Sequence, residues 1–483
     1  MHLAYSVGNL CTANNYGELR VTAALISLAA ILGAFFVVFV RFFTSPAYVK
    51  EFGPITFVYT TQAILLWAIA SLIAGFLIYR VEHDRKFLLR LFLAALVLRL
   101  IVASGIFAFN LQSFFGGDVF TYDWIACNLL KGWQGDALAN VLAGGVMNRP
   151  GAGYGMVYYV TGIYLLVGRN MYAVQLLNSV LGAATVPLIY IAALMIFENR
   201  QVARLSAGAV AFVPSLILWS SQGLKDGPIM FFIAVVFVAT LKLSKRFSLG
   251  YLLLLLCALG FILTLRFYIF YISAAAIVGT LLIGTEAIAA QSFFRQFILL
   301  VLITFSLGYV CMTGYIQAQI QQYGTLEAVN VTRQDLANSA NSGYAKGYDV
   351  STMSGAASTV PVGFLYLLLA PFPWQLNSLR QAITLPEMLF WWTSLPLLVL
   401  GLWHSTRYRF RQVLPILIFT TLLSIAYSVV QGNVGTAYRQ RAQLLIFYFI
   451  LSAAGYVLLK EKYSQKVAEK SLEADRIFPG LIN

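Results

Sequence analysis

Apolar runs long enough to cross a lipid bilayer recur along the whole chain. A spanning helix needs about 20 consecutive apolar residues. Stretches such as "LLLLLCALGFILTL" and "AALVLRLIVASGIFAFN" are continuous and lack the alternation of a membrane β-barrel strand. The pattern therefore predicts an all-α polytopic membrane protein. The twelve predicted spanning helices fall near residues 19–40, 56–79, 88–109, 172–197, 203–221, 228–244, 249–265, 267–284, 296–315, 386–403, 412–430 and 442–459.

Basic residues cluster beside the ends of these runs and set the predicted orientation. Short loops rich in Lys and Arg face the cytoplasm in most membrane proteins. The clusters are residues 79–90, 198–204, 242–246, Arg295, 407–411 and the tail from Lys460. If all of them lie inside, both termini are cytoplasmic and every other loop faces outward.

Two apolar stretches do not fit this count. Residues 152–168 and 360–374 are shorter than a span, and treating either as one would move a basic cluster outside. We interpret both as interfacial or re-entrant helices on the outer face. Short tilted spans are the alternative.

Composition supports the membrane class and excludes others. Hydrophobic residues make up 60% of the chain, charged residues only 10%, and the mean hydropathy is +0.80. The formal net charge of +14 follows the basic loops, so we expect no nucleic-acid partner. The first twenty residues lack the order of a cleavable signal, and the first apolar helix is expected to remain as an anchor.

The cysteines and histidines show no metal-binding pattern. The four cysteines have no CxxC spacing, and the three histidines form no HExxH motif. No cofactor is expected, although a Mg or Mn ion held by carboxylates stays open.

The expected organisation is a single integral membrane domain over residues 1–483. It has an outer polar segment, 316–358, that is too long for a simple connection and could be a lid or disordered. The other parts are a two-span N-terminal elaboration at 1–87, a core at 88–284 whose first outer loop is 110–171, C-terminal spans at 386–459 and a cytoplasmic tail at 460–483.

Two carboxylates stand out in the first outer loop, "FFGGDVFTYDWIACNLLKGW". Gly116 and Gly117 break the preceding helix, and Asp118 then starts a new one. Asp118 could be only a helix cap and Asp123 only a solvated residue. Charge at a membrane edge is costly, however, and often functional.

Several cations fall on the same predicted side. A carboxylate that takes a proton and cations that hold a phosphate are the parts of a transfer reaction. Basic residues also snorkel at membrane edges, which is the favoured reading for Lys225 and Arg380 taken alone. The outward charged residues are Arg149, Lys225, Asp226, Arg266, Arg439 and Arg441, and the last two could form a phosphate-binding fork.

Three segments together resemble a known family. Asp118, Tyr122, Ala126, Asn128, Leu129, Leu130 and Gly132 resemble the first-loop pattern of GT-C membrane glycosyltransferases that use polyprenyl-phosphate sugars. That superfamily contains the protein O-mannosyltransferases and the aminoarabinose transferases of lipid A, and this chain is similar to glycosyltransferase family 39. "NRPGAGY" and "GLKDGP" resemble its later motifs, and "GNVGTAYRQR" is similar to polysaccharide-assembly enzymes.

The resemblance implies a reaction and roles. Asp118 would be the general base for an acceptor hydroxyl of a glycan, lipid or protein, and inversion would release polyprenyl phosphate. Arg149 would hold the donor phosphate, Asp226 would help to position acceptor or sugar, and Arg266, Arg439 and Arg441 would stabilise the leaving group. Tyr122, Asp123 and Lys225 are further substrate-binding candidates. Val119 stands where the family often has an acidic residue.

The resemblance also implies a location, the bacterial inner membrane with an outward-facing active site. Two other functions stay open. One is a polysaccharide polymerase or ligase that acts on a lipid-linked oligosaccharide. The other is a transporter or flippase of lipid-linked sugars, which would show matched halves and charges near the bilayer midplane.

Overall fold

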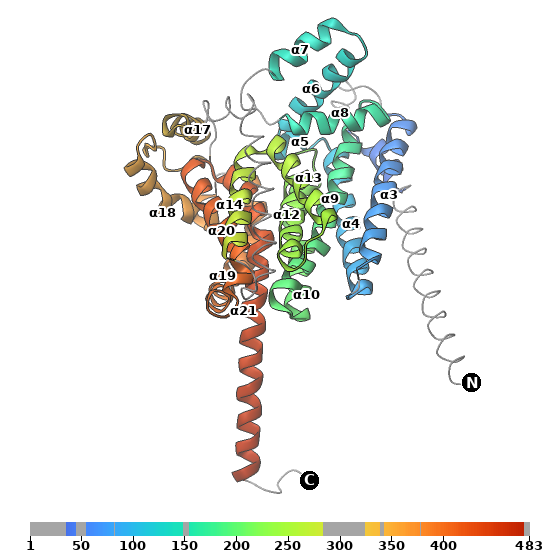
Figure 1. Ribbon diagram of the computed structural model, residues 1–483. Helices are drawn as coiled ribbons and strands as arrows, with labels where there is room; N and C mark the ends of the chain where they lie inside the picture. The colour runs from blue at the N-terminus through green and yellow to red at the C-terminus, as the bar shows by residue number, and fades with distance from the viewer. Residues whose placement is uncertain are drawn as a thin grey trace, which may run out of the picture. The chain divides into compact units, whose positions relative to one another are not determined.

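The computed structural model describes most of the chain, and every regular element in the described part is a helix. The all-α class predicted from the sequence is therefore confirmed (Figure 1). Most of the predicted span 19–40, all of 296–315, Arg149 and Arg295 lie outside the described residues. The described ranges are 35–44, 55–81, 83–147, 154–283, 324–338, 342–376 and 378–477, with side chains up to 469.

The helix lengths fit an integral membrane protein but do not reproduce twelve spans. Within the described ranges, seven helices are long and apolar enough to cross a membrane. A further pair, Arg200–Phe212 and Pro214–Ser220, is bent by 57° and would count as an eighth. The predicted spans 249–265 and 267–284 appear as helices of 17 residues each, just short of the usual crossing length.

The two short apolar stretches are also helical. Gly155–Val167 (α8) lies within the predicted stretch 152–168. The second helix, Met353–Leu369 (α18), begins and ends earlier than 360–374. Thr352 caps its start by accepting from the Gly355 N–H at 3.1 Å, and prolines follow its end.

The chain divides into two compact units. Unit 1 comprises Met1–Val146, Met156–Ala184 and Ile217–Pro228. Unit 2 comprises Met147–Gly155, Thr185–Leu216 and Ile229–Asn483.

Unit 1 holds the first outer loop and the helices around it. The N-cap of α3 is Thr56, whose hydroxyl accepts from the Tyr59 N–H at 3.1 Å. Asn170, just before α9, donates to the Tyr59 carbonyl at 2.7 Å and so fixes α9 to α3. Its helices are α3 (Phe57–Tyr79), α4 (Arg85–Ala108), α5 (Gln112–Phe115), α6 (Asp118–Trp133), α7 (Ala137–Met147), most of α8, the start of α9 (Met171–Phe197), the end of α11 (Pro214–Ser220) and the first turn of α12 (Asp226–Lys245).

Unit 2 holds the remaining helices, and its core is a close crossing of α19 with α21. A Cβ at Gly401 of α19 would stand 1.8 Å from the Leu451 carbonyl oxygen of α21, and one at Gly455 would stand 2.0 Å from the Leu397 oxygen. Only glycine allows the two backbones to approach this closely. Unit 2 contains the later part of α9, the start of α11 and most of α12. Its other helices are α10 (Arg200–Phe212), α13 (Leu249–Leu265), α14 (Phe267–Ile283), α17 (Leu326–Asn338), α18, α19 (Leu379–Tyr408), α20 (Phe410–Val430) and α21 (Val434–Ile477).

The described part of segment 316–358, which the sequence predicts to lie outside, is folded. It contains α17, and residues 342–344 attach to the turn between α20 and α21. Tyr344 N–H donates to the Gly432 carbonyl at 2.8 Å, and Val434 N–H donates to the Ser342 carbonyl at 3.0 Å. Arg333 of α17 donates to the Val429 carbonyl at 3.1 Å, at the last turn of α20. Burial raises the pKa of Tyr344 to about 12.

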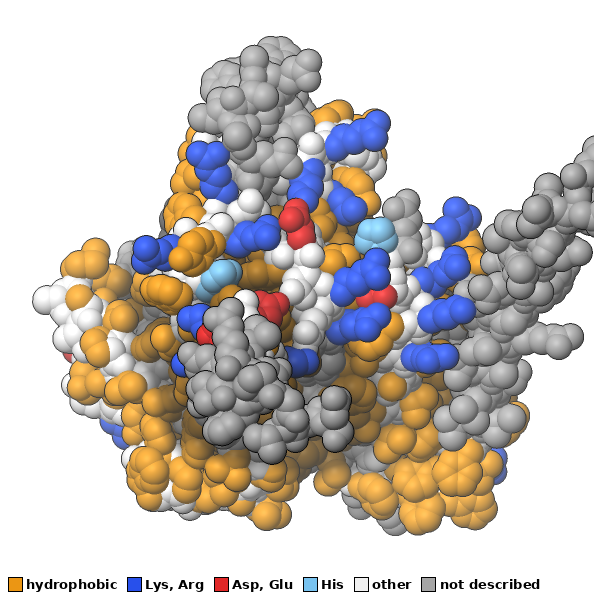
Figure 2. Space-filling view, turned by 90° about the horizontal axis from the view of Figure 1, so that it is seen from below, with side chains coloured by type: hydrophobic (Ala, Val, Ile, Leu, Met, Phe, Trp, Pro, Cys, Tyr) orange, Lys and Arg blue, Asp and Glu red, His pale blue; other side chains and the backbone are white. Residues whose placement is uncertain are grey.

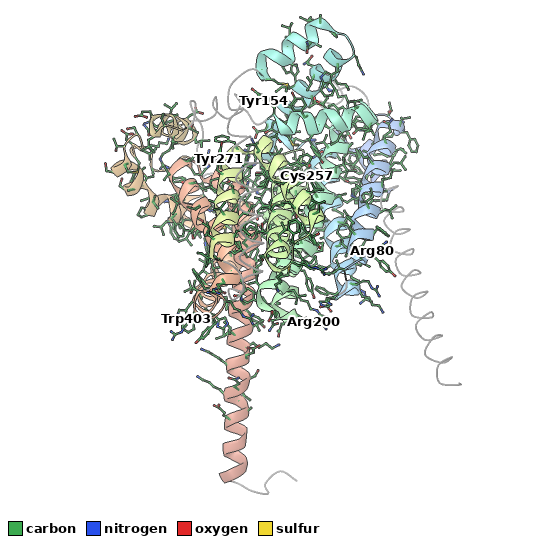
Figure 3. The ribbon with its side chains drawn as sticks, viewed as in Figure 1. Arg80, Tyr154, Arg200, Cys257, Tyr271 and Trp403 are labelled. Carbon is green, nitrogen blue, oxygen red and sulfur yellow. The ribbon has the colours of Figure 1, made fainter. Side chains whose placement is uncertain are left out.

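The basic clusters of unit 2 lie at one end of its helices. Arg409 pairs with Glu198 at 3.4 Å, which joins the clusters 198–204 and 407–411. Arg200 and Trp403 mark this end (Figure 3), and many Lys and Arg side chains are visible on the face seen from there (Figure 2). The arrangement agrees with the positive-inside assignment of these clusters to one side.

Replacement of Gly401 by Ala should destabilise the protein. The new methyl group would meet a backbone oxygen that cannot rotate away, and overpacking of this kind costs roughly 1 to 3 kcal/mol. Gly208→Ala is the matched control, because a Cβ at this position of α10 has nothing within 4 Å. The thermal midpoint in detergent, followed by tryptophan fluorescence, should fall for Gly401→Ala and hold or rise for Gly208→Ala. Equal midpoints for the two variants would contradict the close α19–α21 crossing.

Candidate active site

Asp118 lies in the first turn of α6. The N-cap of α6 is Gly117, and no side chain caps this helix start. Asp118 is therefore the first helical residue and not the cap that the sequence suggested. Its side chain is exposed. A carboxylate in the first turn is favoured by the helix dipole and by the unpaired N–H groups there. Tyr122, one helical turn further along, is partly buried.

Asp226 occupies the same position on α12, and it is fully buried. The preceding break in the helical structure, residues 221–225, includes Lys225, which is partly buried. Asn178 of α9 supports this break, because its side-chain amide donates to the carbonyls of Gln222 at 2.6 Å and Leu224 at 2.8 Å. A polar side chain thus satisfies backbone groups that the helix interruption leaves open.

The structure brings the starts of α6 and α12 together. A Cβ at Gly223, in the break before Asp226, would lie 3.4 Å from a methyl carbon of Val119, the neighbour of Asp118. The apolar Val119 is therefore a packing residue between the two motifs. The contact places the start of α6 next to the break that precedes Asp226 within unit 1.

A buried arginine that the sequence reading missed supports the same region. Arg99 lies inside α4, is 1% exposed, and donates through Nε to the Ser220 hydroxyl at 2.9 Å. Gly182 leaves room for this bond, since a Cβ there would approach the Ser220 Cβ to 2.3 Å. The signal in the sequence was a charged residue within an apolar span, because such a residue is costly to bury and usually has a structural or functional role.

Asp123 makes structural contacts. Its carboxylate is 2% exposed, pairs with the Arg169 guanidinium, and accepts from the Tyr164 hydroxyl at 2.5 Å. These bonds connect α6 with α8 and with the turn before α9. The sequence did not single out Arg169, because the ion pair joins residues 46 positions apart.

Arg266 ends α13 and is nearly buried in unit 2. Its NH1 group donates to the Tyr268 hydroxyl at 3.2 Å, and the Tyr427 hydroxyl lies 3.5 Å away. Tyr427 in turn donates to the Gln443 side chain at 2.6 Å. Arg266 is thus held by a chain of neutral polar groups.

Arg441 caps a helix end. Its NH1 group donates to the carbonyls of Leu368 and Ala370, each at 2.9 Å, and its NH2 group lies 2.9 Å from the Met388 sulfur. Basic side chains near the C-terminus of a helix commonly donate to its last carbonyls, and Arg441 does so for α18. The remaining donor, Nε, is buried without a hydrogen-bond partner among the described residues.

Arg439 and Arg441 do not form the fork suggested by the sequence. Both lie inside α21, and residues two apart on a helix point about 200° apart. Arg439 is partly buried, whereas Arg441 is 1% exposed.

A buried carboxylate on α19 also escaped the sequence reading. Glu387 is 4% exposed and accepts from the Ser215 N–H at 2.6 Å and the Tyr438 hydroxyl at 2.9 Å. It thereby joins α19 and α21 to the start of α11. Across the residues that the structure describes, no three His, Cys, Asp or Glu side chains group in a way suited to a metal ion.

Part of the chain matches a known family. Residues 153–309 match the family described as dolichyl-phosphate-mannose-protein mannosyltransferase. The matched region includes Lys225, Asp226 and Arg266, begins after Asp118, and covers less than half of the chain. It agrees with the resemblance to GT-C membrane glycosyltransferases seen in the motifs. No curated protein matches the sequence.

Two solved structures of the Archaeoglobus fulgidus oligosaccharyltransferase show a distant likeness. The apo form has 12% identity and a TM-score of 0.45, covering 82% of this chain and 52% of that chain. AglB in complex with an inhibitory peptide and a dolichol-phosphate has 11% identity and a TM-score of 0.44, covering 81% and 52%. The chain spans about half the length of these proteins, and a likeness at this level assigns no residue a role.

Removal of the Asp123 charge should reduce stability. Asp123→Asn replaces a buried ionic contact to Arg169, and hydrogen bonds to charged groups contribute about 1.5 to 3 kcal/mol. Arg169 is 40% exposed on its side chain, so we expect a loss near the lower end. The thermal midpoint should fall, while Asp335→Asn, at an exposed carboxylate of α17, should leave it unchanged. A midpoint equal to that of the wild type would show that the contact contributes nothing to the fold.

Proposed function

We propose that this protein is a membrane glycosyltransferase that moves a sugar from a polyprenyl-phosphate donor to an acceptor hydroxyl. The observation that carries the proposal is the match of residues 153–309 to the mannosyltransferase family. The geometry of unit 1 supports it, since Val119, the residue after the first-turn carboxylate Asp118, lies next to Gly223 in the break that precedes Lys225 and Asp226.

Asp118 is the general base of the proposed reaction. Its exposed carboxylate accepts the proton of the acceptor hydroxyl as the oxygen attacks the anomeric carbon. A new oxygen–carbon bond forms, and the bond from the anomeric carbon to the phosphate oxygen breaks. The polyprenyl phosphate leaves with the electron pair. Attack opposite the leaving group inverts the anomeric configuration.

Lys225 and Asp226 have supporting roles in the proposal. Lys225 supplies positive charge for the departing phosphate, where electrostatic stabilisation is often the largest catalytic contribution. Asp226 is buried next to it and orients Lys225 or a sugar hydroxyl. Tyr122 lies one turn beyond Asp118 and is a candidate for contact with the sugar.

A phosphate-binding role for the other cations stays a prediction from the sequence. Arg149 lies outside the described residues, and Arg266, Arg439 and Arg441 belong to unit 2. Of these, Arg441 already donates to the end of α18, which favours a structural role for it.

The proposed reaction takes place at the outward face of a bacterial inner membrane. The support is the charge distribution, because the basic clusters lie on the opposite predicted side from Asp118. A donor that carries a polyprenyl chain stays in the bilayer, so its phosphate sits at the depth of these helix ends. The sugar and the acceptor follow from neither the fold nor the family match.

Replacement of Asp118 by Asn should remove most of the activity. A positioned carboxylate base contributes on the order of 100-fold to 10,000-fold to the rate. Turnover of a polyprenyl-phosphate sugar in detergent should fall by a factor in this range, while the thermal midpoint should remain close to that of the wild type because the side chain is exposed.

Asp335→Asn is the matched control, since it removes an exposed carboxylate from another helix and should keep full turnover. Near-normal turnover by Asp118→Asn would remove the base assignment. Turnover lost together with folding would instead show that Asp118 has a structural role.

A further inference from the structure

A cation-lined cavity lies at the end of unit 2 that carries the basic clusters, where α12 gives way to α13. Its volume is about 560 Å³, within the range of small-molecule sites. Lys242 and Lys245 come from the last turn of α12, and Arg246 follows them. The remaining lining residues are Met195, Phe247, Ser248 and Tyr251. The transferase proposal uses none of these residues.

The cavity concentrates positive charge without a carboxylate in its wall. Among the described residues, the side chains of Lys242 and Arg246 have no ion-pair partner. The start of α13 adds to this charge, since the side chain of its N-cap, Ser248, makes no capping hydrogen bond and leaves first-turn N–H groups open. Lone basic residues often snorkel at a membrane edge with no ligand. Three that share one cavity with a helix N-terminus form a more specific arrangement for an anion.

The wall of the cavity is also partly apolar, because Met195, Phe247 and Tyr251 line it beside the cations. The part of α13 that faces the cavity carries the N-cap Ser248 and Tyr251. The exposed residues Leu249 and Leu253 each lie two positions from Tyr251 and point about 200° away from it. They belong to the other side of α13, so the site is the cavity alone.

We propose that this cavity binds the phosphate headgroup of an anionic membrane lipid. The phosphate accepts hydrogen bonds from Lys242, Lys245 and Arg246, and the walls formed by Phe247 and Tyr251 contact the glycerol region. Basic pockets between helices on the cytoplasmic side suit anionic lipids. A soluble phosphate shares the headgroup chemistry, so the test below includes both.

The test is native mass spectrometry of the full-length, delipidated protein in detergent. The probes are a short-chain phosphatidylglycerol, a phosphatidylcholine of the same chain length, and inorganic phosphate. We expect one phosphatidylglycerol to bind at least tenfold more tightly than phosphatidylcholine. The double variant Lys242→Gln with Arg246→Gln should weaken this binding about 30-fold, as expected for the loss of two attractive charges near an anionic headgroup.

The matched control is Arg200→Gln with Lys462→Gln. It removes one Arg and one Lys from exposed positions on the same predicted side, outside the cavity, and should bind phosphatidylglycerol as the wild type does. The charge-conserving pair Lys242→Arg with Arg246→Lys should also retain binding, which keeps the test informative if the neutral variant folds poorly.

Three results would overturn the proposal. The first is equal affinity for both lipids. The second is an equal loss of binding in the cavity and control pairs, which would indicate general surface attraction. The third is saturable binding of inorganic phosphate as tight as that of phosphatidylglycerol, which would assign the cavity to a soluble anion.

Discussion

A polypeptide inside a hydrocarbon layer must satisfy its own backbone hydrogen bonds, and this constraint governs where the protein can carry chemistry. Continuous helices meet it without help. Each interruption leaves N–H or C=O groups that a side chain must pair. Asn178 does this for the break before Asp226, Arg441 for the end of α18, and Arg333 for the end of α20.

The reactive groups of the proposed reaction lie next to such interruptions. A helix that starts at the membrane edge exposes N–H groups and a positive dipole end, which favour a carboxylate or a phosphate. Asp118 and Asp226 are the first residues of α6 and α12, and Val119, after Asp118, lies next to Gly223 in the break before Asp226. Asn178, which satisfies the backbone of the break before Asp226, therefore also supports the segment that carries the candidate site.

The sequence predicted the helices well because their signal is local. Apolar runs gave the class, and the short lengths of 152–168 and 360–374 foretold short helices, α8 and α18. Asp118 and Asp226 were also singled out from local signals, next to Gly and Pro, and their roles stay predictions. Pairings across the fold could not be predicted this way. The partner of Arg99 is Ser220, 121 residues away, and Glu387 pairs with the N–H of Ser215, 172 residues away.

The central claim is that the protein breaks a bond in a lipid-linked sugar. The most direct measurement is the release of polyprenyl phosphate from radiolabelled polyprenyl-phosphate sugars by the purified wild-type protein in detergent, with acceptors present. Detergent removes the two compartments that a transporter needs, so an enzyme should still transfer label to an acceptor and release the lipid phosphate. If no donor from a broad panel is consumed, yet the protein moves such a lipid across liposome bilayers, the glycosyltransferase account is wrong.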